Sequence, residues 1–314
     1  MPVIAGDEVL IEPLMVGLCA TDRELLDGSM VYLRTGQTSL PLVPGHEWVG
    51  RVALAGEAVT ALAAGDIVVG ECSLGCEQCA ICRAGDYHRC ESRRETGIMG
   101  IDGALSEGLR FPARSAHRVP TEIDIADAVL VEPLAIAVRA IDRLEVSAGD
   151  EVLVVGAGII GTLAIMVLTA DVGADVTLAE PDEWRVERAR AFGLHPAPPA
   201  GTYRRVLEAT GHPAGIQRAL QSLAPGGRLV CVGLTGQQTV AIDVDGLVVR
   251  DQEMCGSLGS PGVWPRTLAL LAAGVIQPQS LISHEFPLVE VAAAFDMAGR
   301  REPGIGKVVV RPHG

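Results

Sequence analysis

The sequence predicts an α/β protein in which a β-rich part is followed by a doubly wound parallel sheet. Up to about residue 120, short apolar runs such as "DEVLIEPLMVGLC" and "GRVALAG" are interrupted by Gly and Pro, which is typical of strands. The pattern then changes, and "EIDIADAVLVEPLAIAVRAIDRL" has the periodicity of a helix. Strands and helices alternate from there on, which indicates a parallel sheet with crossover helices.

The second part can be followed element by element. "GDEVLVVGAGIIG" predicts a buried strand, a glycine turn and the start of a helix, and "ADVTLAEPDEWRVERARAFG" predicts a second strand and helix. Further strands are expected at "YRRVLEATG", "GGRLVCVGL" and "DQEMCGSLG", with helices at "PAGIQRALQSL" and "PRTLALLAAG". The tail, from "ISHEF" to "GKVVVRPHG", predicts one helix and a closing strand.

Bulk properties exclude several classes of protein. The 314 residues suffice for two domains, and a hydrophobic content of 48% allows a sizeable core. A formal net charge of −14 argues against nucleic acid or an anionic membrane as a partner, because both require a basic surface. Since neither a signal segment nor an uninterrupted membrane span is present, we expect a soluble, cytoplasmic protein.

Five of the eight cysteines lie between residues 72 and 90, which in a reducing cytosol favours metal over disulfides. Residues 76–90 read "CEQCAICRAGDYHRC", with the spacing C-x2-C-x2-C-x7-C. Four thiolates at this spacing can surround Zn²⁺ and leave no position for substrate, so the site would be structural. Cys72 could replace Cys76, and free or redox-active thiols are the alternative. The favoured ligands are Cys76, Cys79, Cys82 and Cys90.

A second metal site is expected from three separate segments. Cys19 follows an apolar strand in "GLCATD", His46 and Glu47 lie in the turn "VPGHEWVG", and Glu132 begins a helix in "VEPLAIA". One sulfur, one imidazole and one carboxylate can form a three-ligand zinc site with a free position. Each signal alone is weak, because a histidine in a turn is more often structural.

The segment "EVLVVGAGIIG" contains the dinucleotide-binding pattern G-x-G-x-x-G between a strand and a helix. Gly156 permits the tight turn, Gly158 lets the backbone approach a pyrophosphate, and Gly161 allows close packing of helix and strand. Glu180 ends the next strand, where a carboxylate binds the ribose hydroxyls and favours NAD over NADP. Arg185 is near enough to oppose that preference. A glycine-rich turn without nucleotide is the alternative.

Taken together and in order, these motifs resemble the zinc-dependent medium-chain dehydrogenase/reductase family of alcohol and polyol dehydrogenases. The resemblance covers essentially the whole chain, including "GKVVV" near its end. It implies a GroES-like catalytic domain at 1–133 and 275–314, interrupted by a Rossmann NAD(P)-binding domain at 134–274. It further implies two zinc ions per chain, NAD in preference to NADP, and a homodimer or homotetramer.

The resemblance also assigns roles to residues. Cys19, His46 and Glu132 would bind the catalytic zinc, Glu47 would be a direct or exchanging ligand, and Thr21 would relay the substrate proton. The expected cofactor contacts are Gly156, Gly158, Ile159, Ile160, Gly161, Glu180, Arg185, Thr210, Val232 and Leu258.

Glu132 narrows the substrate class, because simple alcohol dehydrogenases usually have Cys there and sorbitol, glucose and threonine dehydrogenases have Glu. "TDRELLDG" resembles glucose dehydrogenases, while "PGHEW" and "SHEF" resemble dehydrogenases of 2-deoxy-scyllo-inosamine, a cyclitol. The expected reaction is hydride transfer from a secondary alcohol of a polyol, sugar or (amino)cyclitol to NAD(P). Arg23 and Glu24 follow Thr21 closely and either reach the substrate's other hydroxyls or are solvated.

Other functions remain open at this point. The chain could be an NAD(P)-binding protein with structural zinc only, or a dehydrogenase of simple alcohols or threonine. A zinc-free quinone reductase would lack the ligands named above.

Three departures from the family pattern are visible. The chain begins at what resembles the family's second strand, so we expect an N-terminal hairpin strand to be missing. Ala20 replaces the usual Gly after the zinc cysteine. The segment between "ARAFG" and "VLEATG" is short, so one crossover is expected to lack its helix.

Overall fold

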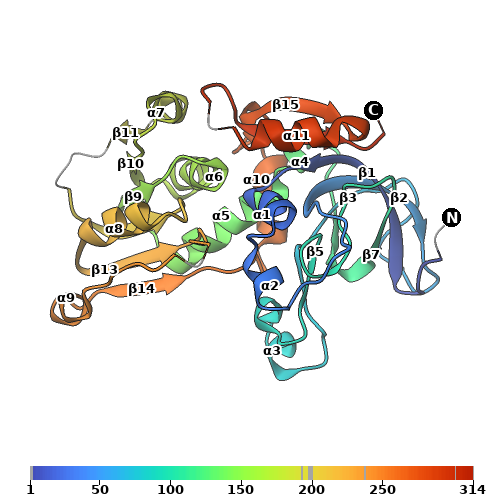
Figure 1. The fold of residues 1–314 in the computed structure, drawn as a ribbon, viewed down its shortest axis with the longest axis horizontal. Coiled ribbons are helices and arrows are strands. Elements are labelled where there is room, and N and C mark those ends of the chain that lie inside the picture. Colours follow the sequence, from blue (N-terminus) through green and yellow to red (C-terminus); the bar gives the residue numbers. More distant parts are fainter. Residues whose placement is uncertain (1–2, 192–193, 197–200, 237, 301, 314) are drawn as a thin grey trace. The chain divides into compact units, whose positions relative to one another are not determined.

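The computed structural model describes residues 3–191, 194–196, 201–236, 238–300 and 302–313 (Figure 1). The chain divides into two compact units, the first made of residues 1–135 and 259–314 and the second of residues 136–258. The second compact unit ends at residue 258, before the domain boundary expected after residue 274, because α10 (Trp264–Ala272) packs within the first unit. There the Trp264 ring stacks on His117 with 5.1 Å between ring centroids.

The first unit is built on a seven-stranded sheet in the order β15-β16-β1-β2-β3-β8, with β7 also paired to β1. Strand β1 (Glu8–Gly17) runs antiparallel to β2 (Glu47–Ala55) and to β16 (Lys307–Arg311). Gly17 lies opposite Glu47 on one side and Val309 on the other. The end of β1 and the beginnings of β2 and β16 therefore lie together, although β16 is at the far end of the chain.

The other elements of the first unit are short. Its remaining strands in the large sheet are β3 (Ile67–Gly70), β7 (Leu109–Pro112), β8 (Ala116–Arg118) and β15 (Ile282–Pro287). A three-stranded sheet contains β4 (Ser73–Leu74), β5 (Arg94–Thr96) and β6 (Gly100–Ile101). The helices besides α10 are α1 (Ala20–Asp27), α2 (Val31–Arg34), α3 (Ala80–Arg83), α4 (Ile125–Ala128), the start of α5 (Val131–Leu144), and α11 (Val291–Ala298). The core includes Trp48, packed edge-on against Phe111 with 5.0 Å between centroids.

The second unit contains a parallel sheet in the order β11-β10-β9-β12-β13-β14. The first strand in sequence lies in the middle and the chain winds outward in both directions, which confirms the predicted doubly wound sheet. The strands are β9 (Glu151–Val155), β10 (Asp175–Ala179), β11 (His195–Pro196), β12 (Tyr203–Glu208), β13 (Leu223–Cys231) and β14 (Glu253–Gly256). The helices after α5 are α6 (Ile159–Val167), α7 (Glu183–Arg190), α8 (Pro213–Gln221) and α9 (Val244–Val249).

Most predicted elements are present where the periodicity placed them. "PAGIQRALQSL" forms α8, "PRTLALLAAG" forms α10, and "GKVVV" forms β16. The shortened crossover between α7 and β12 includes residues 192–193 and 197–200, which lie outside the described part of the chain. Among the described residues, no helix combines the length and apolar character needed to cross a membrane.

Candidate functional site

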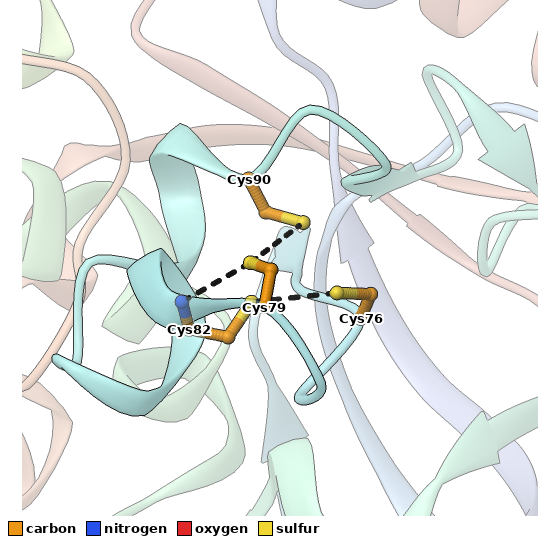
Figure 2. A group of neighbouring side chains, drawn as sticks. All are labelled: Cys76, Cys79, Cys82 and Cys90. Atoms are coloured by element: carbon orange, nitrogen blue, oxygen red, sulfur yellow. Dashed lines mark hydrogen bonds between the residues drawn. The ribbon is translucent and has the colours of Figure 1, made fainter.

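Four cysteine sulfurs converge in the loop that contains α3 (Figure 2). The Sγ atoms of Cys76 and Cys82 are 3.9 Å apart, and those of Cys79 and Cys90 are 3.8 Å apart. A tetrahedron with Zn–S bonds of about 2.3 Å has edges of about 3.8 Å, so this group has the size of a zinc–tetrathiolate site. Cys72 does not belong to the group, which leaves the four favoured cysteines together.

The local backbone prepares this loop for thiolate ligands. Cys79 caps α3 and accepts a hydrogen bond from the Cys82 N–H at 3.4 Å. The N–H groups of Gln78 and Cys79 lower the pKa of Cys76 to about 6, because they stabilise its thiolate. Burial raises the pKa of Cys82 to about 12. Without a cation, therefore, four thiolates would not coexist here, and a divalent metal fits the donor set.

A second group of metal-ligand atoms lies at the end of β1. One ligand atom each from Cys19, His46 and Glu47 lies within 4.8 Å of the others. Cys19 is the N-cap of α1, and His46 and Glu47 enter β2 opposite Gly17. His46 and Glu47 are only 4% and 2% exposed, whereas Cys19 is partly exposed. The sequence prediction placed these three residues at one metal site, and the structure brings them together.

Asp22, which the sequence analysis did not single out, organises the two turns that carry these ligands. Its carboxylate is fully buried, and Oδ1 lies 3.3 Å from His46 Nδ1. The same carboxylate accepts the N–H groups of Cys19 at 2.8 Å and Gly45 at 3.1 Å. An acidic residue three positions after a helix cap is the sequence signal that could have identified it. The contact at Nδ1 leaves His46 Nε2 as the nitrogen available to a metal.

The Asp22–His46 pair is electrostatically coupled. Burial opposes the charged imidazolium, but Asp22 and Cys19 outweigh it and raise the pKa of His46 well above 6.5. Burial likewise opposes the Asp22 carboxylate, yet His46 and the two backbone donors lower its pKa. The pair therefore favours the protonated imidazole in the metal-free site.

Lys307, the only lysine of the chain, forms a buried ion pair with Glu47. Both side chains are 3% exposed, and Lys307 Nζ also donates to the Leu18 carbonyl at 3.1 Å. A Cβ on Gly17 would lie 2.5 Å from Glu47 Oε2, so only glycine leaves room for this carboxylate. Sequence reasoning missed this contact because it joins opposite ends of the chain.

Glu132, the second residue of α5, is 6% exposed but is not one of the three converging ligands. Burial raises its pKa to about 7, while His46 opposes the shift and Glu47 adds to it. The buried acids of the site, Asp22, Glu47 and Glu132, outnumber its two buried basic groups, His46 and Lys307. The surplus of buried acidic groups fits a cation, and the mixed sulfur, nitrogen and oxygen donors suit zinc.

The other residues predicted near this site lie on α1. Thr21 is partly exposed in its first turn. The guanidinium of Arg23 lies against Gly299, where an added Cβ would fall 1.3 Å from Nη1. Glu24 is partly buried, and burial together with Asp27 raises its pKa. Arg23 is exposed and its guanidinium lies against Gly299, whereas Glu24 is partly buried, so Glu24 is the better candidate for a polar substrate contact.

In the second unit, the predicted glycine turn joins β9 to α6 and is tight. Gly156 has φ +100°, a conformation that favours glycine. A Cβ on Gly161 would lie 1.9 Å from the Gly156 carbonyl oxygen, so helix and turn are in close contact. A Cβ on Gly158 would meet nothing within 4 Å, which leaves an open cradle at the helix N-terminus.

Glu180 lies immediately after β10 and is folded onto this turn. Its Oε2 accepts the Ala157 N–H at 2.7 Å and its Oε1 accepts the Asp182 N–H at 3.0 Å. Arg185 Nη1 is 4.0 Å from Glu180 Oε2. Glu180 is therefore the nearer of the two predicted ribose-contacting groups to the turn.

Three of the remaining predicted cofactor contacts, Thr210, Val232 and Leu258, follow the carboxyl ends of β12, β13 and β14. This is the sheet edge at which such folds bind nucleotides. Thr210 lies against the glycine turn, since a Cβ added to Gly156 would be 2.6 Å from Thr210 Cγ2. The Thr210 N–H donates to Oε1 of the buried Glu208 at 2.7 Å. The Val232 N–H donates to the Glu208 carbonyl at 2.9 Å. Ile159 and Ile160 begin α6 and are partly exposed, and Leu258 is 42% exposed.

Comparisons with known proteins agree with this architecture. Residues 5–121 match the alcohol dehydrogenase GroES-like domain, and residues 160–273 match the zinc-binding dehydrogenase domain. An L-threonine 3-dehydrogenase of Bacillus licheniformis is 30% identical over 99% of this chain and 93% of its own. A sorbitol dehydrogenase of Bacillus subtilis is 25% identical over 100% of this chain and 92% of its own.

Solved structures give the same result. A zinc-binding dehydrogenase of Sinorhizobium meliloti, bound to NADP, superposes with a TM-score of 0.90 at 28% identity over 99% of this chain and 94% of its own. An alcohol dehydrogenase of Thermus sp. ATN1 has the same TM-score, identity and coverage. The GroES-like and Rossmann folds expected from the sequence are thereby confirmed, and the chain belongs to the zinc-dependent medium-chain dehydrogenase/reductase family.

Proposed function

We propose that the chain is a zinc- and NAD-dependent dehydrogenase that oxidises a secondary hydroxyl of a polyol, sugar or (amino)cyclitol. The observation that carries the proposal is the convergence of Cys19, His46 and Glu47 in a buried acidic site. The open cradle at Gly158 supports a dinucleotide as the hydride acceptor. A structural protein would need neither the group of mixed sulfur, nitrogen and oxygen ligands nor the open space at Gly158.

Each of the following residues would have a separate role in the reaction. Cys19 and His46 would hold the catalytic zinc, with Glu47 as a direct or exchanging ligand and Glu132 as the further acidic ligand. When bound, zinc supplies a Lewis acid that lowers the pKa of the substrate hydroxyl, and nicotinamide accepts the hydride. The side-chain oxygen of Thr21 would accept the proton of the substrate hydroxyl, and the proton that Thr21 already carries would pass to the next acceptor. Lys307 holds one oxygen of Glu47 and so limits how that carboxylate turns.

Two zinc ions per chain are proposed, because the tetrathiolate group and the Cys19 group are separate and have different donor sets. The first would be structural, since four protein sulfurs fill its coordination sphere. The second would be catalytic and more easily removed by a chelator.

NAD is proposed in preference to NADP. A carboxylate at Glu180 accepts hydrogen bonds from ribose hydroxyls and repels a 2′-phosphate. The Sinorhizobium meliloti structure is bound to NADP, and Arg185 could favour the same cofactor here. Measuring kcat/KM with NAD and with NADP tests this preference. A higher value with NADP would show that Arg185 determines the choice of cofactor more than Glu180 does.

The substrate class is proposed from the relatives and from Glu24. Relatives include sorbitol dehydrogenases, a D-arabinitol dehydrogenase of Uromyces fabae and an erythritol/L-threitol dehydrogenase of Mycolicibacterium smegmatis. All of these act on polyols by name, and the partly buried Glu24 offers an acceptor for a further hydroxyl.

The test is NADH formation with a panel of sugars, linear polyols, cyclitols and aminocyclitols. L-Threonine and 2-butanol are included, because threonine dehydrogenases are among the relatives. We expect the highest kcat/KM with a polyhydroxylated substrate. Absence of turnover with every compound, together with one bound zinc per chain, would favour an NAD(P)-binding protein with structural zinc only.

A further inference from the structure

Arg188, on α7, is connected to the glycine turn by a contact that the function described above does not use. Its Nη2 donates to the Ala157 carbonyl at 3.0 Å. The guanidinium carbon lies 4.7 Å from the centre of the Trp184 ring, one helical turn earlier. A cation over an indole face is favourable and fixes the side chain in one position.

Hydrogen bonds hold both peptide groups of Ala157, the one that contains its N–H and the one that contains its carbonyl. Its N–H donates to Glu180 Oε2 at 2.7 Å, and its carbonyl accepts from Arg188 and, at 3.3 Å, from Thr162 Oγ1. In a trans peptide the carbonyl and the following N–H point in opposite directions. With the Ala157 carbonyl held by Arg188 and Thr162, the Gly158 N–H is directed the other way.

This orientation matters for anion binding. A helix N-terminus binds a pyrophosphate through N–H groups, and a carbonyl turned toward the anion would repel it. Gly158 itself cannot prevent such a rotation by steric hindrance, since a Cβ there would meet nothing within 4 Å. The restraint on the carbonyl has to come from a neighbour.

We infer that Arg188 is a positioning residue for the cofactor pyrophosphate: by holding the Ala157 carbonyl, it keeps the Gly158 N–H directed at the anion. The inference rests on the proposed function, since it assumes that the turn binds a dinucleotide. Arg188 acts on the part of the cofactor that NAD and NADP share. Glu180 and Arg185, in contrast, are proposed to contact the ribose by which the two cofactors differ, although Glu180 also accepts the Ala157 N–H.

The experiment measures Kd for NADH and NADPH by fluorescence titration of the purified zinc-loaded protein and of Arg188→Met. Methionine keeps an unbranched apolar side chain against Trp184 and removes the guanidinium that donates to the Ala157 carbonyl. Loss of one charge-assisted hydrogen bond is expected to weaken both cofactors about 10-fold. The ratio of the two Kd values should stay within a factor of about two, and KM for NAD should rise while kcat changes little.

Arg190→Met is the matched control, because Arg190 is exposed on the same helix and pairs only with Glu187, at 2.9 Å, among the contacts of the described chain. It should bind both cofactors as the wild type does. Glu180→Ala should shift the ratio of the two Kd values, which Arg188→Met should not. If Arg188→Met does not fold, Trp184→Leu carries the test, since it keeps the guanidinium and removes the ring that holds it. A several-fold loss for both cofactors is then expected.

The outcomes separate this inference from the function on which it rests. Wild-type protein that binds neither NADH nor NADPH would overturn both. Wild-type binding with an unchanged Kd in Arg188→Met, or in Trp184→Leu where that variant is used, would overturn the positioning role alone. A loss confined to NADPH would also overturn it, because Arg188 would then contact the 2′-phosphate.

Discussion

Asp22 Oδ1 lies 3.3 Å from His46 Nδ1, and the same carboxylate accepts the backbone N–H groups of Cys19 and Gly45. One buried acid thus contacts the imidazole of one proposed zinc ligand, holds the backbone of another and holds the turn that leads into β2. Partners of this kind orient metal ligands and increase their basicity. The geometry of the site therefore depends on a residue that would not touch the metal.

Asp22→Asn should lower the affinity of the catalytic site for zinc about 10- to 100-fold. An amide can accept some of these hydrogen bonds, but it removes the charge that supports His46. The measurement is zinc retained after dialysis against a chelator series, with the structural zinc as internal reference. Asp27→Asn is the control, since Asp27 is exposed and contacts Ser29. Equal retention by both variants would contradict the prediction.

Zinc uptake by this site should depend on pH. The pKa of His46 is raised well above 6.5 in the metal-free site, so below that pKa a proton must leave before zinc binds. The apparent affinity should therefore rise as pH increases through the raised pKa of His46. In Asp22→Asn the pKa of His46 falls, so the rise should occur at lower pH. Competition titrations at several pH values measure this, and a pH-independent affinity would argue against proton displacement.

Cys90→Ser should remove the structural zinc and destabilise the first unit. The four sulfurs form a closed group, so loss of one ligand removes folding energy that the metal provides. We expect zinc content to fall from two ions to one and the protein to aggregate or melt earlier. Cys72→Ser is the matched control, because Cys72 is outside the group, and it should keep both ions. Loss of a zinc ion in that variant instead would show that Cys72 is a ligand.

Gly17→Ala should impair catalysis with zinc still bound. Its Cβ would lie 2.5 Å from Glu47 Oε2 and 3.5 Å from Lys307 Cε, so the ion pair has to move. A displacement of about 1 Å at a catalytic centre can lower kcat/KM about 100-fold. Gly108→Ala is the control, since its Cβ would meet no atom closer than 3.8 Å. Wild-type kcat/KM in Gly17→Ala would show that the position of Glu47 is unimportant.

The parts of the fold that follow from local pattern could be predicted from the sequence. Period and glycine spacing identified β9, the turn at Gly156 and α6, because a strand, a phosphate turn and a helix are contiguous. The boundary at Gly259 could not be predicted, because the periodicity of α10 shows that it is a helix but not which unit it packs against.

The same distinction applies to the site. Cys19, His46 and Glu47 stand in recognisable motifs, and the four cysteines have a diagnostic spacing. Lys307 and Arg188 could not be assigned, since each acts through a tertiary contact with a distant segment, Lys307 with Glu47 and Arg188 with Ala157. Charge and residue type alone would have described both as ordinary surface cations.

The substrate prediction rests on Glu24. This side chain is partly buried on α1, three residues after Thr21, whereas Arg23 is engaged with Gly299. A pocket that hydrogen-bonds hydroxyl groups rejects analogues without them, because its polar groups would be left unpaired. Glu24→Ala should therefore lower kcat/KM for the best polyol at least about 10-fold and leave 2-butanol nearly unchanged. Glu57→Ala, on an exposed turn of the same unit, serves as the control. Equal losses on both substrates in Glu24→Ala, or a wild-type preference for 2-butanol, would refute the polyol assignment.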